Sequence, residues 1–108
     1  MTVKEFSEKS GFAPIALPDG DREITGAYIG DLLSWVMGRA TTGDAWITIM
    51  SNINVIAVAS LADAACVILA EGVELDEKVT AAAEAKGVNV LSAPCGAFEA
   101  ACRLNELI

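Results

Sequence analysis

Histidine is absent from the 108 residues, and cysteine occurs only three times, at Cys66, Cys95 and Cys102. A chain without histidine cannot form a Ser-His-Asp or Cys-His catalytic arrangement, and it lacks the commonest zinc ligand. Three cysteines without paired spacing predict no disulfide framework and are typical of a reducing compartment. We therefore expect a cytoplasmic chain without a metal or a cofactor.

Basic residues are scarce, because seven lysines and arginines stand against 15 aspartates and glutamates, for a net charge of −8. The seven are scattered, so they cannot build the phosphate-neutralising patch that nucleic-acid binding requires. An anionic membrane surface is disfavoured for the same reason. Residues 1–10 hold two lysines with no apolar core after them, so we expect no signal peptide.

One apolar run, residues 46–70, has the length of a membrane span and contains a single charge. Asn52, Asn54 and Asp63 lie inside the run, and each of them is costly in hydrocarbon. Two buried strands on either side of a buried helix account for the same residues. We therefore expect no membrane partner.

Apolar residues are abundant, at 54% of the chain, and the mean hydropathy is +0.48. A chain of this length most often forms one domain around a single core, so residues 1–108 are expected to be one domain. Small domains have a large surface for their volume, so part of the apolar content should face another chain. The composition therefore predicts a homodimer.

The first 29 residues alternate short elements with turns. Residues 2–5 read T-x-x-E, which predicts a capping box for a short helix closed by Gly11. Residues 12–17 are expected to form a strand, and Pro14 lies either in an edge strand or near the start of the strand. Residues 18–21 have the composition of a turn. Residues 23–29 are expected to be extended, with Gly26 marking a bulge or a close backbone approach.

A second helix is expected after Asp31, whose side chain can cap it, and Gly38 is expected to end it. Trp35 lies off the apolar face of this helix, so it is a candidate anchor for an interface. The apolar positions expected to share one face are Leu32, Leu33, Val36 and Met37.

The second half reads as alternating strands and helices. Strands are expected at 45–50, 66–70 and 88–91, and helices at 76–87 and from residue 94 onward. Residues 54–62 fit either a strand, from their β-branched residues, or a helix that starts near Asn54. Such alternation predicts an α/β fold with parallel strands joined by right-handed crossovers.

Asn54 and Asn52 are candidate ligand-binding residues because they follow the expected strand 45–50. In open parallel sheets, ligands bind beyond the carboxyl ends of strands, where free helix N–H groups favour anions. The alternative is that Asn54 is a simple N-cap and Asn52 a solvated loop residue. Neither G-x-G-x-x-G nor a P-loop follows any strand, so a nucleotide would be held by a less stereotyped site.

Four further candidates lie between residues 22 and 31. Arg22 can present its guanidinium to a phosphate or to a partner's carboxylate, or it can form a surface ion pair beside Asp21. Thr25 and Gly26 fit either a ligand site or a half-buried strand with a bend. Asp31 is a candidate ligand residue or a helix cap.

Cys95 and Cys102 are seven residues apart, which predicts that they share one face of the last helix. A thiol at a helix start can have a lowered pKa, which leaves a thiol enzyme as one hypothesis. The alternative is that the cysteines are small apolar side chains, since no residue supplies a base.

Several motifs occur together in this order: Asp21-Arg22, Thr25-Gly26, residues 31–37, 46–49 and 54–59, Gly87, Val90-Leu91 and Phe98. Together they resemble the DRTGG domain family over about residues 1–107. One position departs from the family pattern, because Ala27 replaces the second glycine of the naming motif. An alanine there requires a backbone with negative φ.

The resemblance implies a three-layer α/β/α domain with a mainly parallel sheet, similar to the N-terminal domain of HPr kinase/phosphorylase. Related domains accompany adenine-nucleotide-binding CBS domains in certain pyrophosphatases and occur in some phosphotransacetylases, where they regulate and lie at subunit interfaces. The first hypothesis is thus a non-enzymatic, homodimeric regulatory domain that senses a nucleotide or another small anion. The second is an interaction subunit that docks on a kinase-like or metabolic enzyme without a small-molecule ligand.

Overall fold

Ten helices and strands follow one another in the computed structural model, which describes residues 1–108. In chain order they are α1 (Val3–Ser10), β1 (Ala13–Ala16), β2 (Gly26–Ile29), α2 (Leu33–Arg39), β3 (Asp44–Thr48), α3 (Ile53–Leu61), β4 (Cys66–Leu69), α4 (Glu77–Lys86), β5 (Val90–Ser92) and α5 (Ala97–Leu107). The strands form one sheet in the order β1-β5-β4-β3-β2. Strand β1 is antiparallel to β5, and all other neighbours are parallel.

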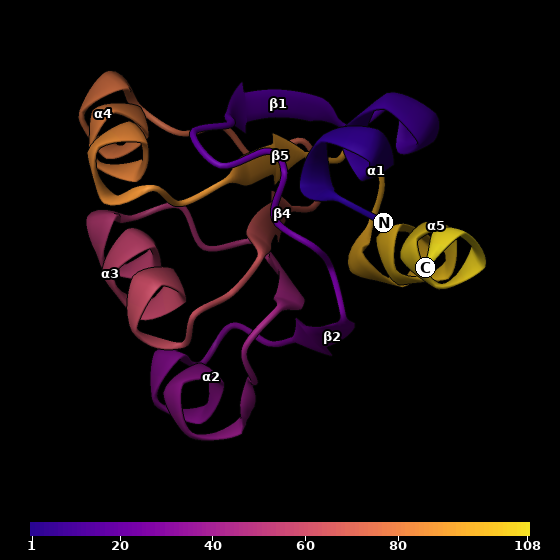
Figure 1. Ribbon diagram of the computed structural model, residues 1–108. Helices are drawn as coiled ribbons and strands as arrows, with labels where there is room; N and C mark the ends of the chain where they lie inside the picture. The colour runs from indigo at the N-terminus through magenta and orange to yellow at the C-terminus, as the bar shows by residue number, and fades with distance from the viewer.

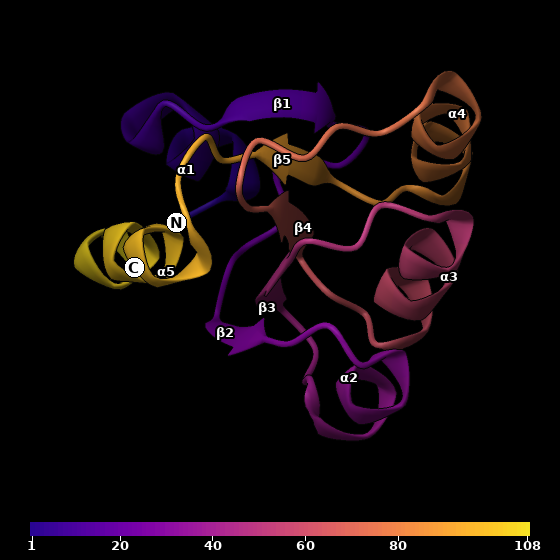
Figure 2. The same ribbon diagram turned by 180° about the vertical axis from the view of Figure 1, so that it is seen from behind.

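The sheet is the middle of three layers. Helices α2, α3 and α4 cover one face, and α1 and α5 cover the other, as Figures 1 and 2 show from opposite sides. Parallel strands cannot be joined by short hairpins, so α2, α3 and α4 serve as the crossovers on one face, while the terminal helices α1 and α5 cover the other. The predicted three-layer α/β fold with a mainly parallel sheet is confirmed.

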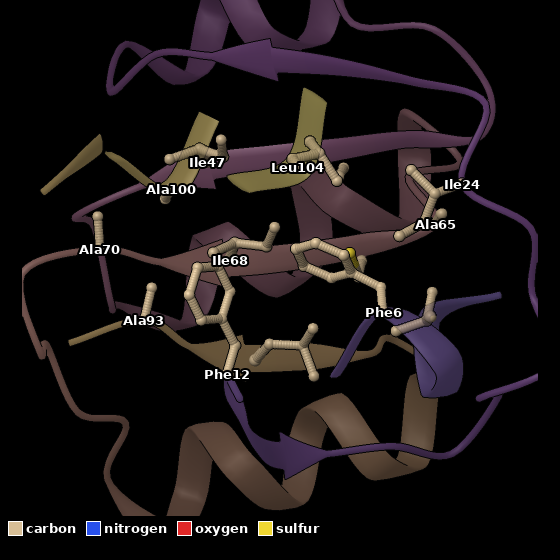
Figure 3. Close-up of a cluster of buried hydrophobic side chains, with 14 residues drawn as sticks. Phe6, Phe12, Ile24, Ile47, Ala65, Ile68, Ala70, Ala93, Ala100 and Leu104 are labelled. Carbon is tan, nitrogen blue, oxygen red and sulfur yellow. The ribbon is translucent and has the colours of Figure 1, made fainter. Parts of the chain in front are cut away.

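Strands β3 and β4 lie at the centre of the fold, and every one of their residues is buried. On the α1–α5 side, the rings of Phe6 and Phe12 meet edge to face at 5.5 Å and lie beside Ile68 (Figure 3). On the other side, Trp46 is fully buried in a second apolar cluster. Coverage on both faces explains why these strands are continuous apolar runs.

Local capping signals placed the first and fourth helices correctly. The Thr2 hydroxyl accepts a hydrogen bond from the backbone N–H of Glu5, and the Glu5 carboxylate accepts one from the N–H of Thr2. The bonds from the backbone and the hydroxyl of Thr2 lower the pKa of Glu5. Asp76 caps α4 by accepting from Val79 N at 2.9 Å, and Gly87 ends it with φ of +71°.

Helix α2 differs from its prediction. It starts at Leu33 without a side-chain cap and runs through Gly38 to Arg39. The predicted single apolar face is wrong, because Leu32 and Met37 are both 54% exposed and Val36 is the only fully buried residue. The physical reason is that α2 lies at the margin of its layer and packs mainly on α3.

Trp35 lies off the core as predicted. It is 51% exposed on the outer side of α2, and the guanidinium of Arg39 lies 3.7 Å from its ring centroid. This cation–π contact satisfies one face of the indole, while the rest of the side chain stays open to solvent.

Residues 53–61 form helix α3, so the strand alternative for this segment is wrong. The β-branched residues Val55, Ile56 and Val58 are buried against the sheet, and this packing outweighs their modest preference for strands. The cap is Asn52 rather than Asn54, since Asn52 Oδ1 accepts from Asn54 N at 2.9 Å.

A testable consequence concerns Asn89, which is 2% exposed and joins two distant segments. Its side chain accepts from Asp19 N at 2.9 Å and donates to Asp19 O at 2.7 Å and to Ala65 O at 2.9 Å. Asn89→Ala leaves these buried groups unpaired and should lower the free energy of unfolding by about 2–4 kcal/mol in urea titrations. The matched control Asn105→Ala, on the exposed side of α5, should change it by less than about 0.5 kcal/mol. Equal effects of the two variants would contradict this role.

Candidate functional site

The carboxyl ends of β2 and β3 are tied together by Asp31. Its Oδ1 accepts from the Thr48 hydroxyl at 2.7 Å and from Ile49 N at 3.0 Å. Next to it, the Trp46 indole N–H donates to Gly30 O at 2.8 Å. Asp31 is therefore not the cap of α2, because its carboxylate is used by the neighbouring strand.

Asn52 and Asn54 lie at the same edge, at the start of α3. The side-chain oxygen of Asn52 caps the helix by accepting a hydrogen bond from Asn54 N. Asn54 is exposed as the second residue of α3, and its side chain makes no hydrogen bond within the chain. The structure thus brings Asn52, Asn54 and Asp31 to one edge of the sheet, as expected for residues that follow parallel strands.

The opposite, amino-terminal edge of the sheet holds Arg22. Its Nη1 forms an ion pair with Asp63 Oδ1 at 2.9 Å, and its Nη2 donates to Asp63 O at 2.8 Å. Asp63 is a turn residue with a left-handed φ of +56°, and its carbonyl also accepts from Gly43 N. The ion-pair partner of Arg22 is therefore Asp63 rather than the adjacent Asp21.

A hollow of about 100 Å³ opens beside this ion pair. Its polar side chains are Arg22, Asp63, Ser60 and Lys86, and it lies between the ends of α3 and α4. Lys86 forms no ion pair, whereas Arg22 is paired with Asp63. The hollow therefore carries one uncompensated positive charge.

Thr25 shapes the turn at the amino-terminal edge next to Arg22. Its backbone N–H donates to Gly43 O at 2.9 Å, and its hydroxyl donates to Thr42 O at 3.3 Å. Gly43 has φ of +88°, and a Cβ there would collide with the Thr25 hydroxyl. Thr25 and Gly43 therefore depend on one another for the close approach of two backbone segments.

Gly26 and Ala27 begin strand β2. A Cβ on Gly26 would lie 2.7 Å from Asp44 Oδ1, and the buried Asp44 carboxylate accepts from Thr41 N at 2.9 Å. The predicted close backbone approach at Gly26 is thus present. Ala27 has no positive φ and is exposed, so its methyl group is accommodated without backbone strain.

The six candidate residues separate into two groups of three. Arg22, Thr25 and Gly26 lie at the amino-terminal edge, whereas Asp31, Asn52 and Asn54 lie at the carboxyl edge. The four-residue strand β2 separates the edges by about 13 Å. A single small ligand cannot contact all six side chains.

The two edges also differ in charge. Carboxylates follow the parallel strands at the carboxyl edge, where Asp31, Glu71 and Asp76 are exposed. The amino-terminal edge has both signs, because Arg22 and Lys86 line the hollow, Asp63 pairs with Arg22 and Asp44 begins β3. Any attraction of an anion to this edge therefore comes from Lys86, the cation without an ion-pair partner, and this edge is opposite to the one that the fold rule singles out.

Sequence reasoning missed the contribution of Lys86 and the partnership of Arg22 with Asp63. Arg22 and Asp63 are 41 positions apart, so no local spacing in the sequence signals their contact. In the sequence, Asp63 stands out only as the single charge of the apolar run 46–70. The position of Asp63 between two apolar runs is the one sequence feature that could have pointed to its contact with Arg22.

The three cysteines lie in three different environments. Burial raises the pKa of Cys66 to about 12. Cys95 precedes α5 and packs partly against the core, while Cys102 is exposed. The prediction that the two share one helix face is therefore wrong. No group of three or more histidine, cysteine, aspartate or glutamate side chains is placed to hold a metal ion.

Comparison with known proteins identifies a family. A family model described as the DRTGG domain matches residues 19–107. The fold resembles a crystal structure of the CBS and DRTGG domains of the regulatory region of Clostridium perfringens pyrophosphatase, complexed with its activator diadenosine tetraphosphate. That match has a TM-score of 0.74 at 11% identity and covers 95% of this chain and 45% of the other. No curated protein sequence matches this chain.

None of the five helices is long and apolar enough to cross a membrane.

Thiol labelling follows directly from the cysteine environments. Since the thiolate is the nucleophile, Cys66 with its pKa near 12 should resist iodoacetamide at pH 8 until the chain unfolds. Cys102 should react first because it is exposed. Mass spectrometry of the labelled chain gives the order. Labelling of Cys66 in the folded chain, or a thiol that reacts faster than free cysteine, would contradict this expectation.

The close approach at Gly26 predicts opposite effects for two glycine substitutions. Gly26→Ala forces its methyl group against Asp44 and should destabilise the chain by about 1–3 kcal/mol. Gly38→Ala lies within α2 with no atom within 4 Å of the added Cβ, so it should stabilise by about 0.5–1 kcal/mol. Urea titrations of both variants measure the difference. If both substitutions changed the free energy of unfolding in the same direction, the close approach at Gly26 would be contradicted.

Proposed function

The chain belongs to the DRTGG domain family, and we propose that it is a non-enzymatic regulatory domain of the cytoplasm that forms a homodimer and senses a nucleotide or another small anion. The regulatory role is supported by the pyrophosphatase regulatory region that shares the fold. The anion is suggested by the nucleotide activator bound in that structure.

A role without catalysis is supported by the groups that are present. The chain has no histidine, and the thiol of Cys66 is buried with a raised pKa. The hollow beside Arg22 pairs exposed charges and holds no buried acid, base or nucleophile. General acid–base and nucleophilic catalysis both require such a group.

The single observation that carries the anion hypothesis is the unpaired Lys86 in the hollow. Two cations and the Ser60 hydroxyl converge there, and only one cation has a partner. A volume of about 100 Å³ accommodates a phosphate group, whereas sites for whole drug-sized ligands measure roughly 300–1,000 Å³. We therefore place the phosphate of a nucleotide in the hollow and the remainder on the adjoining surface.

The carboxyl edge offers a different chemistry. Asn54 has a free side-chain amide, and Asp31 has one carboxylate oxygen outside its bonds to Thr48 and Ile49. These groups suit hydroxyls rather than phosphates, because the neighbouring carboxylates repel anions. We propose Asn52, Asn54 and Asp31 as a second contact region for uncharged ligand groups only.

The runner-up function is an interaction subunit that docks on a kinase-like or metabolic enzyme and binds no small molecule. It is favoured by large apolar side chains that are half exposed on α2, outside any hollow. Leu32, Trp35 and Met37 are between 51% and 54% exposed. Aromatic and aliphatic groups of this kind are typical interface anchors.

Thermal denaturation with ligands tests the sensor hypothesis. We expect ATP, AMP, diadenosine tetraphosphate or inorganic phosphate at millimolar concentration to raise the melting temperature. Saturation at tenfold the dissociation constant adds about 1.4 kcal/mol, which corresponds to roughly 6 °C for a domain of this size. The matched variants are Lys86→Gln, in the hollow, and Lys78→Gln, in the first turn of the same helix.

Lys86→Gln should remove most of that rise, because a charge-assisted hydrogen bond contributes about 1.5–3 kcal/mol. Lys78→Gln should leave it intact. If no ligand shifts the transition, the sensor hypothesis is rejected and the docking subunit is the remaining function. A rise that survives in Lys86→Gln would mean that the anion does not bind in the hollow.

A further inference from the structure

Strand β2 has one face that no helix covers. Ala27 and Ile29 pair with Ala45 and Ile47 of β3, so their side chains point to the face covered by α1 and α5. Figure 1 shows α5 level with the middle of the sheet and no helix beside β2 on that side. As a result Ile29 is 51% exposed.

The flank of α5 that faces β2 carries three apolar residues, and Asn105 is the polar residue among them. Phe98, Ala101 and Ile108 are spaced by three and seven residues, so they share one stripe of the helix. Helix α1 packs on the other flank, where Arg103 Nη2 approaches Lys9 O at 3.4 Å. Phe98 is 80% exposed and Ile108 47% exposed, although both are large apolar side chains.

These residues form one surface, which we call the β2–α5 face. Ile49 follows β3 at the carboxyl edge of the sheet, where β2 ends at Ile29 and α5 begins. It is 48% exposed. No member of the face carries a charged side chain. The face consists of Ala27, Ile29, Ile49, Phe98, Ala101 and Ile108.

Strand β2 is the outermost strand on its side of the sheet, and the backbone groups on its outer side have no partner strand. Since the Thr25 N–H points to Gly43 of the β3 side, alternation along the strand directs the N–H groups of Gly26 and Tyr28 outward. Natural edge strands are usually protected by charged residues, proline or a bulge. The residues of β2, Gly26–Ile29, include none of these.

We propose that the β2–α5 face is where two copies of this chain meet, with the β2 strands antiparallel about a two-fold axis. This inference rests on the homodimer of the proposed function and locates its interface. Two identical edges are complementary to each other in the antiparallel direction, so the pair would continue the sheet across the interface. Each copy would present its α5 flank to the other.

Area favours a second copy as the occupant, and the absence of charged side chains among the six residues permits one. Two chains of net charge −8 repel one another at long range, so their contact needs a surface without charged side chains of its own; the six residues carry none, and Oδ1 of the neighbouring Asp31 accepts from Thr48 and Ile49. A basic partner would gain nothing from this uncharged face. The four large side chains leave on the order of 450 Å² open, and the β2 backbone and two alanines bring the face near the roughly 600 Å² per partner at the lower limit of stable interfaces.

Size-exclusion chromatography with light scattering of the full chain tests the proposal. We expect the wild-type chain at micromolar concentration to have about twice the monomer mass of 11.2 kDa. Ile29→Glu and Phe98→Glu should each raise the dimer dissociation constant about 30-fold or more, because each buries a carboxylate at the centre of the interface. The matched control is Leu61→Glu at the far end of α3, where Leu61 is 73% exposed.

The outcomes separate the two levels of the proposal. A monomeric wild-type chain rejects the homodimer itself and leaves the face to a different protein. A dimer that survives both substitutions rejects the β2–α5 face and keeps the homodimer. A dimer that Leu61→Glu dissolves as readily would also reject the face, since that residue lies outside it.

Hydrogen exchange supplies a readout that a folding defect does not imitate. The Tyr28 amide should be protected in the dimer and should lose protection on dilution, while the inward amide of Thr25 stays protected. Fast exchange of Tyr28 in a stable dimer would reject the strand pairing. Phe98→Glu remains decisive if Ile29→Glu fails to fold, because an acidic residue in the first turn of α5 favours that helix.

Discussion

Burial of β3 and β4 on both faces is the constraint on which the rest of the structure depends. Their residues are all buried, and the polar ones, Asp44 and Thr48, stand at the two ends of β3. A polar group inside these strands would lose its hydration without a partner, at a cost of about 1–3 kcal/mol. Binding chemistry is therefore confined to the two edges of the sheet, which explains why the candidate side chains fall into two separate groups.

Unequal coverage of the sheet accounts for the high mean hydropathy. Three helices cover one face of the five strands, whereas two cover the other, and α5 packs on β3 without reaching over β2. The apolar side chains that a third helix would have covered are instead exposed, with Ile29 and Phe98 as the largest. The exposed apolar side chains therefore lie in two regions, the β2–α5 face and the outer side of α2 and α3, where Trp35 and Leu61 are exposed.

The sequence could predict the elements whose signals are local. Asp76 and Gly87 mark α4 because a cap and a left-handed glycine act within one turn, and the alternation of strands and helices predicts the parallel sheet. The role of Asp31 could not be predicted, since Thr48 competes for its carboxylate across 17 residues of chain. The same holds for Arg22, whose partner depends on where the α3–β4 turn lies in space. Local sequence signals therefore predict helices and strands, whereas the candidate site depends on contacts between residues that become neighbours only in the assembled sheet.

The naming motif of the family illustrates this difference. Thr25 and Gly26 are needed where the chain enters β2, because Gly43 and the buried Asp44 approach them too closely for larger groups. The next position has no such neighbour and an ordinary backbone, so nothing in its surroundings demands a second glycine. Ala27 points to the open face of β2, where its methyl group enlarges the apolar surface. The departure from the motif therefore leaves the amino-terminal turn intact and changes the uncovered face of the sheet instead.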